Sequence, residues 1–186
     1  MDLPWGDERS NKFITNVGLI TSDGPLGQDV MACEWTHHVS YNLGLIVVCI
    51  RPHDATHENI IKTKEFGVNL CSTDQSIMSS VAGGYSGKSY DKIAALKELG
   101  FEFYKASRIK APMVKGAALN AECKLVNEFD LGDHMMFVGE VIEAPGNFEP
   151  LAYHGGRYWI MNTNVQKPSQ DERERIRKIV EKYRKS

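Results

Sequence analysis

Short apolar runs rich in β-branched residues, separated by turn residues, make up most of this chain and limit the folds open to it. The longest apolar run extends from Leu43 to Ile50, far short of the about 20 residues that a membrane-spanning helix needs. Its continuously apolar part, 45–50, predicts a strand that is buried on both faces. Other runs predict strands at 13–21, 30–35, 66–71, 117–126 (half-buried) and 135–142, a turn at 22–25, and a hairpin at 153–158 with Gly-Gly at its tip.

Helical patterns interrupt these strands at irregular intervals. We expect helices at 54–63, 74–82 and 91–99, the last two on either side of a glycine-rich loop. A doubly wound parallel sheet needs strands and helices that alternate regularly, so this order argues against it. The sequence therefore predicts a mainly β fold, barrel-like and antiparallel, with helices inserted between the strands.

The end of the chain differs in charge from the rest. Residues 167–186 hold 8 Lys and Arg against 4 Asp and Glu, a net charge of +4, which leaves −6 for residues 1–166 out of a total of −2. Ser169 and Glu172 form a capping box. Apolar residues then recur at helical spacing: Ile176, Ile179, Val180 and Tyr183. We predict one folded domain, residues 1–165, and then a linker and a C-terminal amphipathic helix, residues 166–186, which docks on its own domain or on a partner subunit.

Composition excludes several classes of function. A chain of 186 residues with 42% hydrophobic and 25% charged residues is typical of one soluble globular domain, and its slightly acidic balance gives no case for nucleic-acid binding. The polar, acidic N-terminus is not a secretory signal, so we expect a cytoplasmic protein with no membrane segment.

The cysteines form no C-x-x-C pair and are expected to be free thiols: Cys33, Cys49, Cys71 and Cys123. The spacing of cysteines and histidines predicts no metal site.

Two segments carry the residue types that bind phosphate. Residues 82–89 nearly match the phosphate loop G-x-x-x-x-G-K-[ST], but Ala82 replaces its first glycine and a predicted helix, not a strand, precedes it. The small residues and Lys88 of this loop suit an anion, although a plain surface loop has the same composition. Arg51 follows a buried strand and Thr56 opens a helix, which predicts either a phosphate grip or a capped turn. No G-x-G-x-x-G motif is present, so a Rossmann dinucleotide site is not supported.

His134 lies in Gly132-Asp133-His134 at the start of a predicted strand. A histidine in this position is a candidate proton donor or a ring that lines a site. A histidine that is hydrogen-bonded within a turn explains the sequence equally well.

Several of these segments match one family in the same order along the chain. They are Asn16–Thr21, Asp29–Trp35 ("N-x-M-[TA]-x-S-W") with Val39-Ser40, Val47–Arg51 with Thr56–Ile60, Phe66–Leu70 ("F-x-V-N"), Ser86–Lys92 ("S-G-x-x-x-D-K"), Asp133–Val141 ("D-H-x-x-F-V-G-E-V") and Pro150–Tyr153 with Gly156–Trp159. Over about residues 5–160 the chain thus resembles the flavin reductase-like family, whose members are FMN-binding split β-barrels.

The resemblance implies a homodimer that binds one FMN per subunit in a cleft at the interface. The segment that passes the isoalloxazine ring would be Met31, Ala32, Cys33, Glu34 and Trp35. The ribityl side would meet Cys49, Ile50 and Arg51, and the phosphate would meet Thr56, Arg51 and Lys88, with Ser86 and Gly87 closing over it. His134 would lie near the open face of the flavin, where a nicotinamide docks. Members of the family often carry Ser or Thr where this chain has Cys33 and Glu34, so Glu34 is expected to point away from the phosphate or to face the ring.

Three classes of function remain open. The first is an NADH- or NADPH-dependent flavin reductase that passes electrons to free flavin, oxygen or a redox protein. The second is an FMN-binding electron carrier that serves a protein partner. The third is a binding module without a redox role, for a flavin or for another ligand such as haem. The first two need the same FMN site, because the flavin performs the electron transfer and the protein supplies binding and electrostatics.

Overall fold

The strands of the protein form antiparallel sheets, as a computed structural model shows for residues 1–4, 6–146, 148–163 and 167–181. The strands are β1 (Thr15–Asn16), β2 (Gly18–Gly24), β3 (Gly27–Cys33), β4 (Thr36–Ser40), β5 (Leu45–Ile50), β6 (Glu65–Leu70), β7 (Phe103–Lys105), β8 (Pro112–Val114), β9 (Leu119–Asp130), β10 (Met135–Glu143), β11 (Leu151–His154) and β12 (Arg157–Ile160). The helices are a 3₁₀ turn (Ser10–Lys12), α1 (Ala55–Thr63), α2 (Ser76–Gly84), α3 (Lys92–Glu98) and α4 (Gln170–Glu181).

A seven-stranded sheet with the order β3-β2-β6-β9-β10-β5-β4 curls into most of a barrel. Its two edge strands are consecutive in the chain, and the segment between them closes the curl. There the amide of Cys49 on β5 donates to the carbonyl of Trp35 (3.0 Å). A small sheet, β1-β11-β12, and the hairpin β7-β8 complete the body. The predicted antiparallel, barrel-like fold is therefore confirmed.

The strand predicted at 45–50 has the predicted bounds, but its burial differs from the prediction. Ile46, Val48 and Ile50 are buried, whereas the residues between them are partly exposed. Strands with both faces buried are instead β2 and β6. On β2, Leu19 packs in the cluster beneath α2 and α3, and Ile20 packs in the cluster inside the curled sheet. β2 has a helix against its outer face, whereas β5 lies beside the edge strand β4.

Several local predictions need correction. The strand β2 continues through Ser22 to Gly24, so the turn predicted at 22–25 is shorter and lies at Pro25-Leu26. The strands β4, β7 and β8 have no counterpart in the prediction. The hairpin at 153–158 is confirmed, with positive φ angles of 57° and 74° at Gly155 and Gly156, where glycine is the favoured residue.

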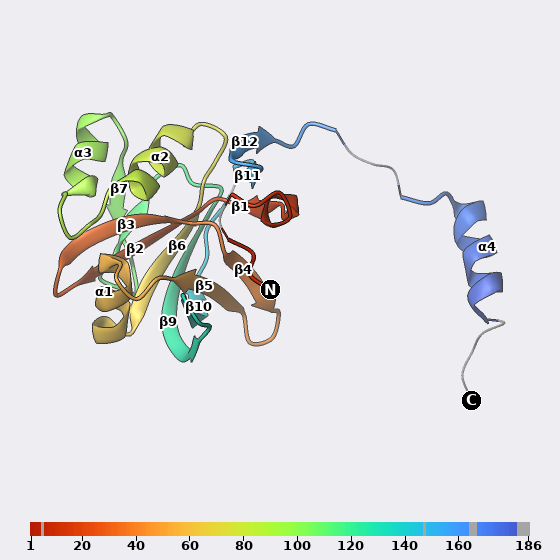
Figure 1. Cartoon of the computed structure of the whole chain (residues 1–186), viewed down its shortest axis with the longest axis horizontal. Helices are drawn as coiled ribbons and strands as arrows, with labels where there is room; N and C mark the ends of the chain where they lie inside the picture. Colours follow the sequence, from red (N-terminus) through yellow and green to blue (C-terminus); the bar gives the residue numbers. More distant parts are fainter. Residues whose placement is uncertain (5, 147, 164–166, 182–186) are drawn as a thin grey trace.

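Three helices pack on the outer side of the curled sheet, against β2 and β3, and the inner side is filled by the buried core. Figure 1 shows α2 and α3 together beside β3, and α1 below them against β2. α1 begins after its N-cap residue Asp54, and Glu58 in its first turn lies 3.9 Å from Lys88 in the segment between α2 and α3. This arrangement brings three chain segments that are distant in sequence to one end of the barrel.

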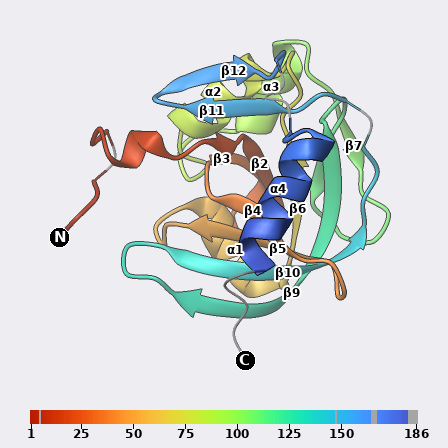
Figure 2. The same ribbon diagram turned by 90° about the vertical axis from the view of Figure 1, so that its right-hand side faces the viewer.

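The C-terminal helix α4 stands apart from the barrel in Figure 1, and in the view turned by 90° it lies in front of the sheet (Figure 2). The predicted capping box is present: the Ser169 amide donates to the Glu172 carboxylate (2.9 Å) and the Glu172 amide donates to the Ser169 hydroxyl (3.2 Å). Ile176 and Ile179 are exposed. The predicted domain boundary at 165/166 and Tyr183 lie outside the described residues. Within the described chain, no helix has the length and apolar character needed to cross a membrane.

Candidate active site

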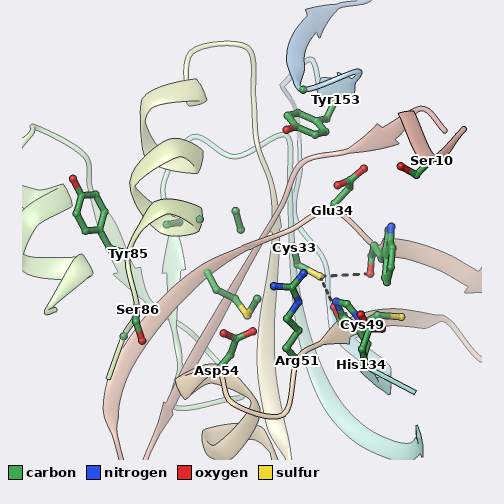
Figure 3. A pocket seen from close by; sticks show the side chains of 18 of the residues that line it. Ser10, Cys33, Glu34, Cys49, Arg51, Asp54, Tyr85, Ser86, His134 and Tyr153 are labelled. Carbon is green, nitrogen blue, oxygen red and sulfur yellow. Dashed lines mark hydrogen bonds and ion pairs between the residues drawn. The ribbon is translucent and has the colours of Figure 1, made fainter. Parts of the chain in front are cut away.

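A cavity of about 810 Å³ opens beside the closing segment of the barrel. This volume lies within the range of sites for small molecules and cofactors. Its wall combines the N-terminal segment, strand β3, the end of β5, the start of α1, the segment between α2 and α3, the start of β10 and the tip of the β11–β12 hairpin. Figure 3 shows Asp54 and Ser86 at one end, Arg51 near the centre, and His134 with Cys49 at the other end.

The end of β3 and the two residues after it form the longest continuous part of the wall. Met31, Ala32, Cys33, Glu34 and Trp35 all line the cavity. Here the strand reaches the end of its pairing with β2, at Cys33 opposite Gly18. Backbone groups at such a sheet edge are available to hydrogen-bond the edge of a flat heterocycle.

Two cysteines line this wall as neutral thiols. Burial raises the pKa of the Cys33 thiol to about 11, and burial also raises the pKa of Cys49. The Cys33 thiol donates to the carbonyl oxygens of Cys49 (3.3 Å) and Trp35 (3.5 Å). Since a thiolate is the reactive form of cysteine, these side chains are suited to shaping the cavity and not to nucleophilic attack.

One end of the cavity is suited to an anion. Asp54 and Ala55 place the start of α1 in the wall there, and the exposed Arg51 lies between this end and the centre of the cavity (Figure 3). The first amides of a helix lack intrahelical acceptors and carry a partial positive charge. Ser86 and Gly87 approach from the segment between α2 and α3. A guanidinium, a helix N-terminus and a loop of small residues together form a plausible phosphate cradle.

Three predicted site residues lie outside the cavity wall. Ile50 is fully buried in the barrel core. Thr56 is also fully buried, and its hydroxyl donates to the Asp29 carboxylate (2.8 Å) and so is not turned to the cavity. Lys88 lies on the outside, with its ammonium 3.9 Å from Glu58. These positions differ from the expectation because the strand and helix pattern shows which elements meet, but not which face of each element turns inward.

His134 lies at the other end of the cavity. Its Nδ1 is 2.7 Å from the carboxylate of Asp133, and its side chain is only 13% exposed although Asp133 is 80% exposed. The Trp35 ring lies against it, with ring centroids 4.6 Å apart. The hydrogen bond to His134 lowers the pKa of Asp133. A carboxylate that holds Nδ1 orients the imidazole ring and leaves Nε2 for a ligand.

Glu34 is a half-buried carboxyl group near Tyr153 (Figure 3). Burial raises its pKa, and the neighbouring Thr15 hydroxyl opposes this effect. Beyond Glu34, a side chamber of about 300 Å³ shares the 32–34 wall with the main cavity. A hydrogen-bonded chain of hydroxyls lines this chamber, in which Tyr158 bonds both Ser79 (3.1 Å) and Ser80 (3.3 Å).

Several wall residues were not identified from the sequence. The N-terminal segment adds Leu3, Pro4, Ser10, Asn11 and Phe13, and the remaining additions are Asp29, Asp54, Ala55, Ala82, Gly83, Tyr85, Lys92, Asp133, Tyr153, Gly155 and Gly156. Period-two alternation along β3 offers a signal for Asp29, because it shares a strand face with Met31 and Cys33. No periodicity marks the N-terminal segment. Among the described residues, no group of three or more His, Cys, Asp or Glu side chains is arranged to hold a metal ion.

The family model described as "Flavin reductase like domain" matches residues 10–161. The chain therefore belongs to the flavin reductase-like family, and the resemblance inferred from its sequence motifs is confirmed.

Individual relatives agree with this assignment. The chain is 31% identical to an uncharacterised protein of Pyrococcus abyssi, over 69% of this chain and 71% of that protein. It is 25% identical to the FMN reductase (NADH) SmoA of Agrobacterium fabrum, over 78% and 79% of the two chains. Among solved structures, the flavin reductase PheA2 in its native state superposes with a TM-score of 0.73 at 28% identity, over 88% of this chain and 100% of that one.

Proposed function

We propose that this protein is a flavin reductase that binds FMN and oxidises NADH or NADPH. The observation that carries the proposal is one cavity that has the start of α1 and Ser86-Gly87 at one end, Arg51 near the centre, and Trp35 with His134 at the other end. A flavin mononucleotide has the same polarity, with a phosphate at one end and a flat ring at the other. The names of relatives such as the FMN reductase SmoA support the same activity.

The wall residues fit the parts of FMN. The phosphate would lie against Arg51, the amides at the start of α1, and Ser86-Gly87. The isoalloxazine ring would lie along Met31 to Trp35, where small side chains such as Ala32 and the exposed strand edge leave room for it. We favour FMN over FAD because the described residues of the wall offer one anion cradle and no second nucleotide-binding motif. Bound flavin supplies the redox chemistry, namely hydride acceptance and electron donation.

The residues of this chain would then bind, orient and exclude water. Asp133 holds Nδ1 of His134, and we place the nicotinamide of the dinucleotide beside Nε2 of this ring. Trp35 restricts the imidazole from the other side. Because the thiols of Cys33 and Cys49 have raised pKa values, they remain neutral beside the ring.

A second copy of the chain would complete the site, as the family resemblance implies. Two apolar side chains of the cavity wall are exposed, Phe13 at 65% and Trp35 at 47%, and Ile14, which follows Phe13, is 70% exposed. Burial of such side chains is a common basis for stable association. We further propose that the dimer works in the cytoplasm, where the four free cysteines would stay reduced.

The proposal is tested by measuring NADH and NADPH consumption with added FMN, FAD and riboflavin as electron acceptors. Chromatography of the flavin extracted from the purified protein identifies the cofactor, and light scattering gives the mass of the assembly. We expect FMN, a dimer, and consumption of the reduced dinucleotide that depends on flavin. Flavin binding without consumption would support an electron carrier, and the absence of flavin binding would refute the proposal.

A further inference from the structure

A buried ion pair lies in the wall at the phosphate end of the cavity. Asp29 on β3 and Lys92 at the start of α3 are 3% and 3% exposed, and Lys92 Nζ lies 3.1 Å from Asp29 Oδ1. Both residues line the cavity. A charge pair so well shielded from water pays a large desolvation cost, which good geometry only partly offsets. Its presence beside an anion-binding site therefore calls for a specific role.

The Asp29 carboxylate joins the elements that make the cradle. It accepts a hydrogen bond from the hydroxyl of Thr56, in the first turn of α1 (2.8 Å). The Gly87 backbone packs directly on the same carboxylate, so closely that a Cβ at Gly87 would overlap it. The Asp29 carboxylate on β3 thus contacts both the first turn of α1 and the 85–91 segment and fixes their positions relative to the strand.

This carboxylate places a negative charge where a phosphate has to bind. Lys92 is the only cation within ion-pair distance of it in the described part of the chain. The ammonium also donates to the carbonyl of Ala82 at the end of α2 (3.3 Å), so that it is held by two elements of the same wall. In a poorly solvated site an unbalanced charge acts strongly on a neighbouring one.

We propose that Asp29 and Lys92 act as a positioning pair that sets the preference of the cavity for a phosphorylated flavin. Asp29 aligns the walls of the cradle, and Lys92 cancels the charge of Asp29 so that the phosphate is not repelled. This inference rests on the proposed function. The inference adds to that function by assigning the preference for phosphate to two residues that shape the cavity wall and do not contact the flavin ring.

The two single substitutions are expected to have different effects on FMN binding. Lys92→Met leaves an uncompensated carboxylate, so FMN affinity falls by about tenfold or more, while affinity for riboflavin, which lacks the phosphate, changes less than about threefold. Asp29→Asn leaves an ammonium whose counter-charge the phosphate supplies, so FMN affinity is kept or increased relative to riboflavin. In the double variant the ratio of the two affinities returns to within about threefold of that of the wild type.

The experiment is a fluorescence titration of each flavin-free variant with FMN and with riboflavin, after circular dichroism has shown that the variant is folded. Lys115→Met is the matched control, because it breaks an exposed ion pair with Glu102, and neither residue belongs to the cavity wall. A purely structural role would weaken both ligands equally in both single variants, and that result would overturn the inference. If Lys92→Met does not fold, Asp29→Asn and the double variant decide: a lower FMN-to-riboflavin affinity ratio in Asp29→Asn would overturn it.

The outcome is separable from that of the proposed function. If the wild-type protein binds neither flavin, the proposed function fails. If the wild type binds FMN but all variants keep its FMN-to-riboflavin ratio, only the positioning role fails.

Discussion

Replacing Arg51 with alanine removes the cation on which the proposed phosphate site most depends. Among the described residues of the cavity wall, Arg51 is the only Lys or Arg without a carboxylate within ion-pair distance, since Lys92 is paired with Asp29. A hydrogen bond to a charged group contributes about 1.5–3 kcal/mol. The variant should therefore bind FMN about 10–150-fold more weakly, at 1.4 kcal/mol per tenfold change in Kd.

Salt and the choice of ligand distinguish this electrostatic loss from a general defect. Because Arg51 is exposed, the loss should be larger at about 0.1 M than at about 1 M salt, where the screening length falls from about 10 to about 3 Å. Riboflavin should bind the variant and the wild type almost equally. The assay is fluorescence titration of flavin-free protein, with Arg108→Ala, an exposed arginine outside the wall, as control. An unchanged Kd for FMN, or an equal loss for riboflavin, would remove Arg51 from the phosphate site.

Three further substitutions test other parts of the account. His134→Ala should lower kcat/KM for NADH by about 10–100-fold and leave FMN binding nearly intact, an effect at or below the 10²–10⁴-fold of general acid–base catalysis; an unchanged kcat/KM would place the nicotinamide elsewhere. Gly139→Ala should cost about 1–3 kcal/mol in urea unfolding, because its Cβ would lie 2.5 Å from Phe66 Cζ, whereas Gly44→Ala, with nothing closer than 3.9 Å, should be nearly neutral. Glu34→Gln should raise the thermal midpoint more at about pH 7 than at about pH 4. Burial raises the pKa of Glu34 in the folded protein, so the wild type loses stability as the pH rises through this pKa and the carboxyl group ionises. Equal shifts at both pH values would contradict this.

The sequence predicted most elements because their patterns are local. The continuous apolar run at 45–50 predicted the bounds of β5, and Ser169 with Glu172 predicted the start of α4. The strands β7 and β8 were missed because each is three residues long, too short for a period to show. The Leu45–Ile50 strand appeared buried on both faces because its hydrophobic run is continuous, although one face lies partly open beside an edge strand.

Site residues could be predicted from the sequence where a family motif, such as the one at 29–35, also lines the cavity. Met31 to Trp35 line the cavity together because a strand edge exposes consecutive backbone groups at its end. Thr56 was assigned to the phosphate, but its hydroxyl is satisfied by Asp29. A contact between residues 27 positions apart depends on how α1 crosses β3, and no spacing within either segment encodes it. The same reason explains why the Asp29–Lys92 pair was not anticipated.

The central claim, that this chain passes electrons from a reduced dinucleotide to a bound flavin, is tested most directly by anaerobic stopped-flow absorbance. The protein loaded with FMN is mixed with NADH or NADPH over a range of concentrations, and bleaching of the visible flavin absorbance is followed. The account predicts bleaching that saturates with the dinucleotide at a concentration in the upper part of the about 1 μM–1 mM range usual for KM, since no Rossmann motif adds affinity. If neither dinucleotide bleaches the flavin within minutes at about 1 mM, while a reduced ferredoxin-like protein does, the protein is an electron carrier and the reductase assignment is wrong.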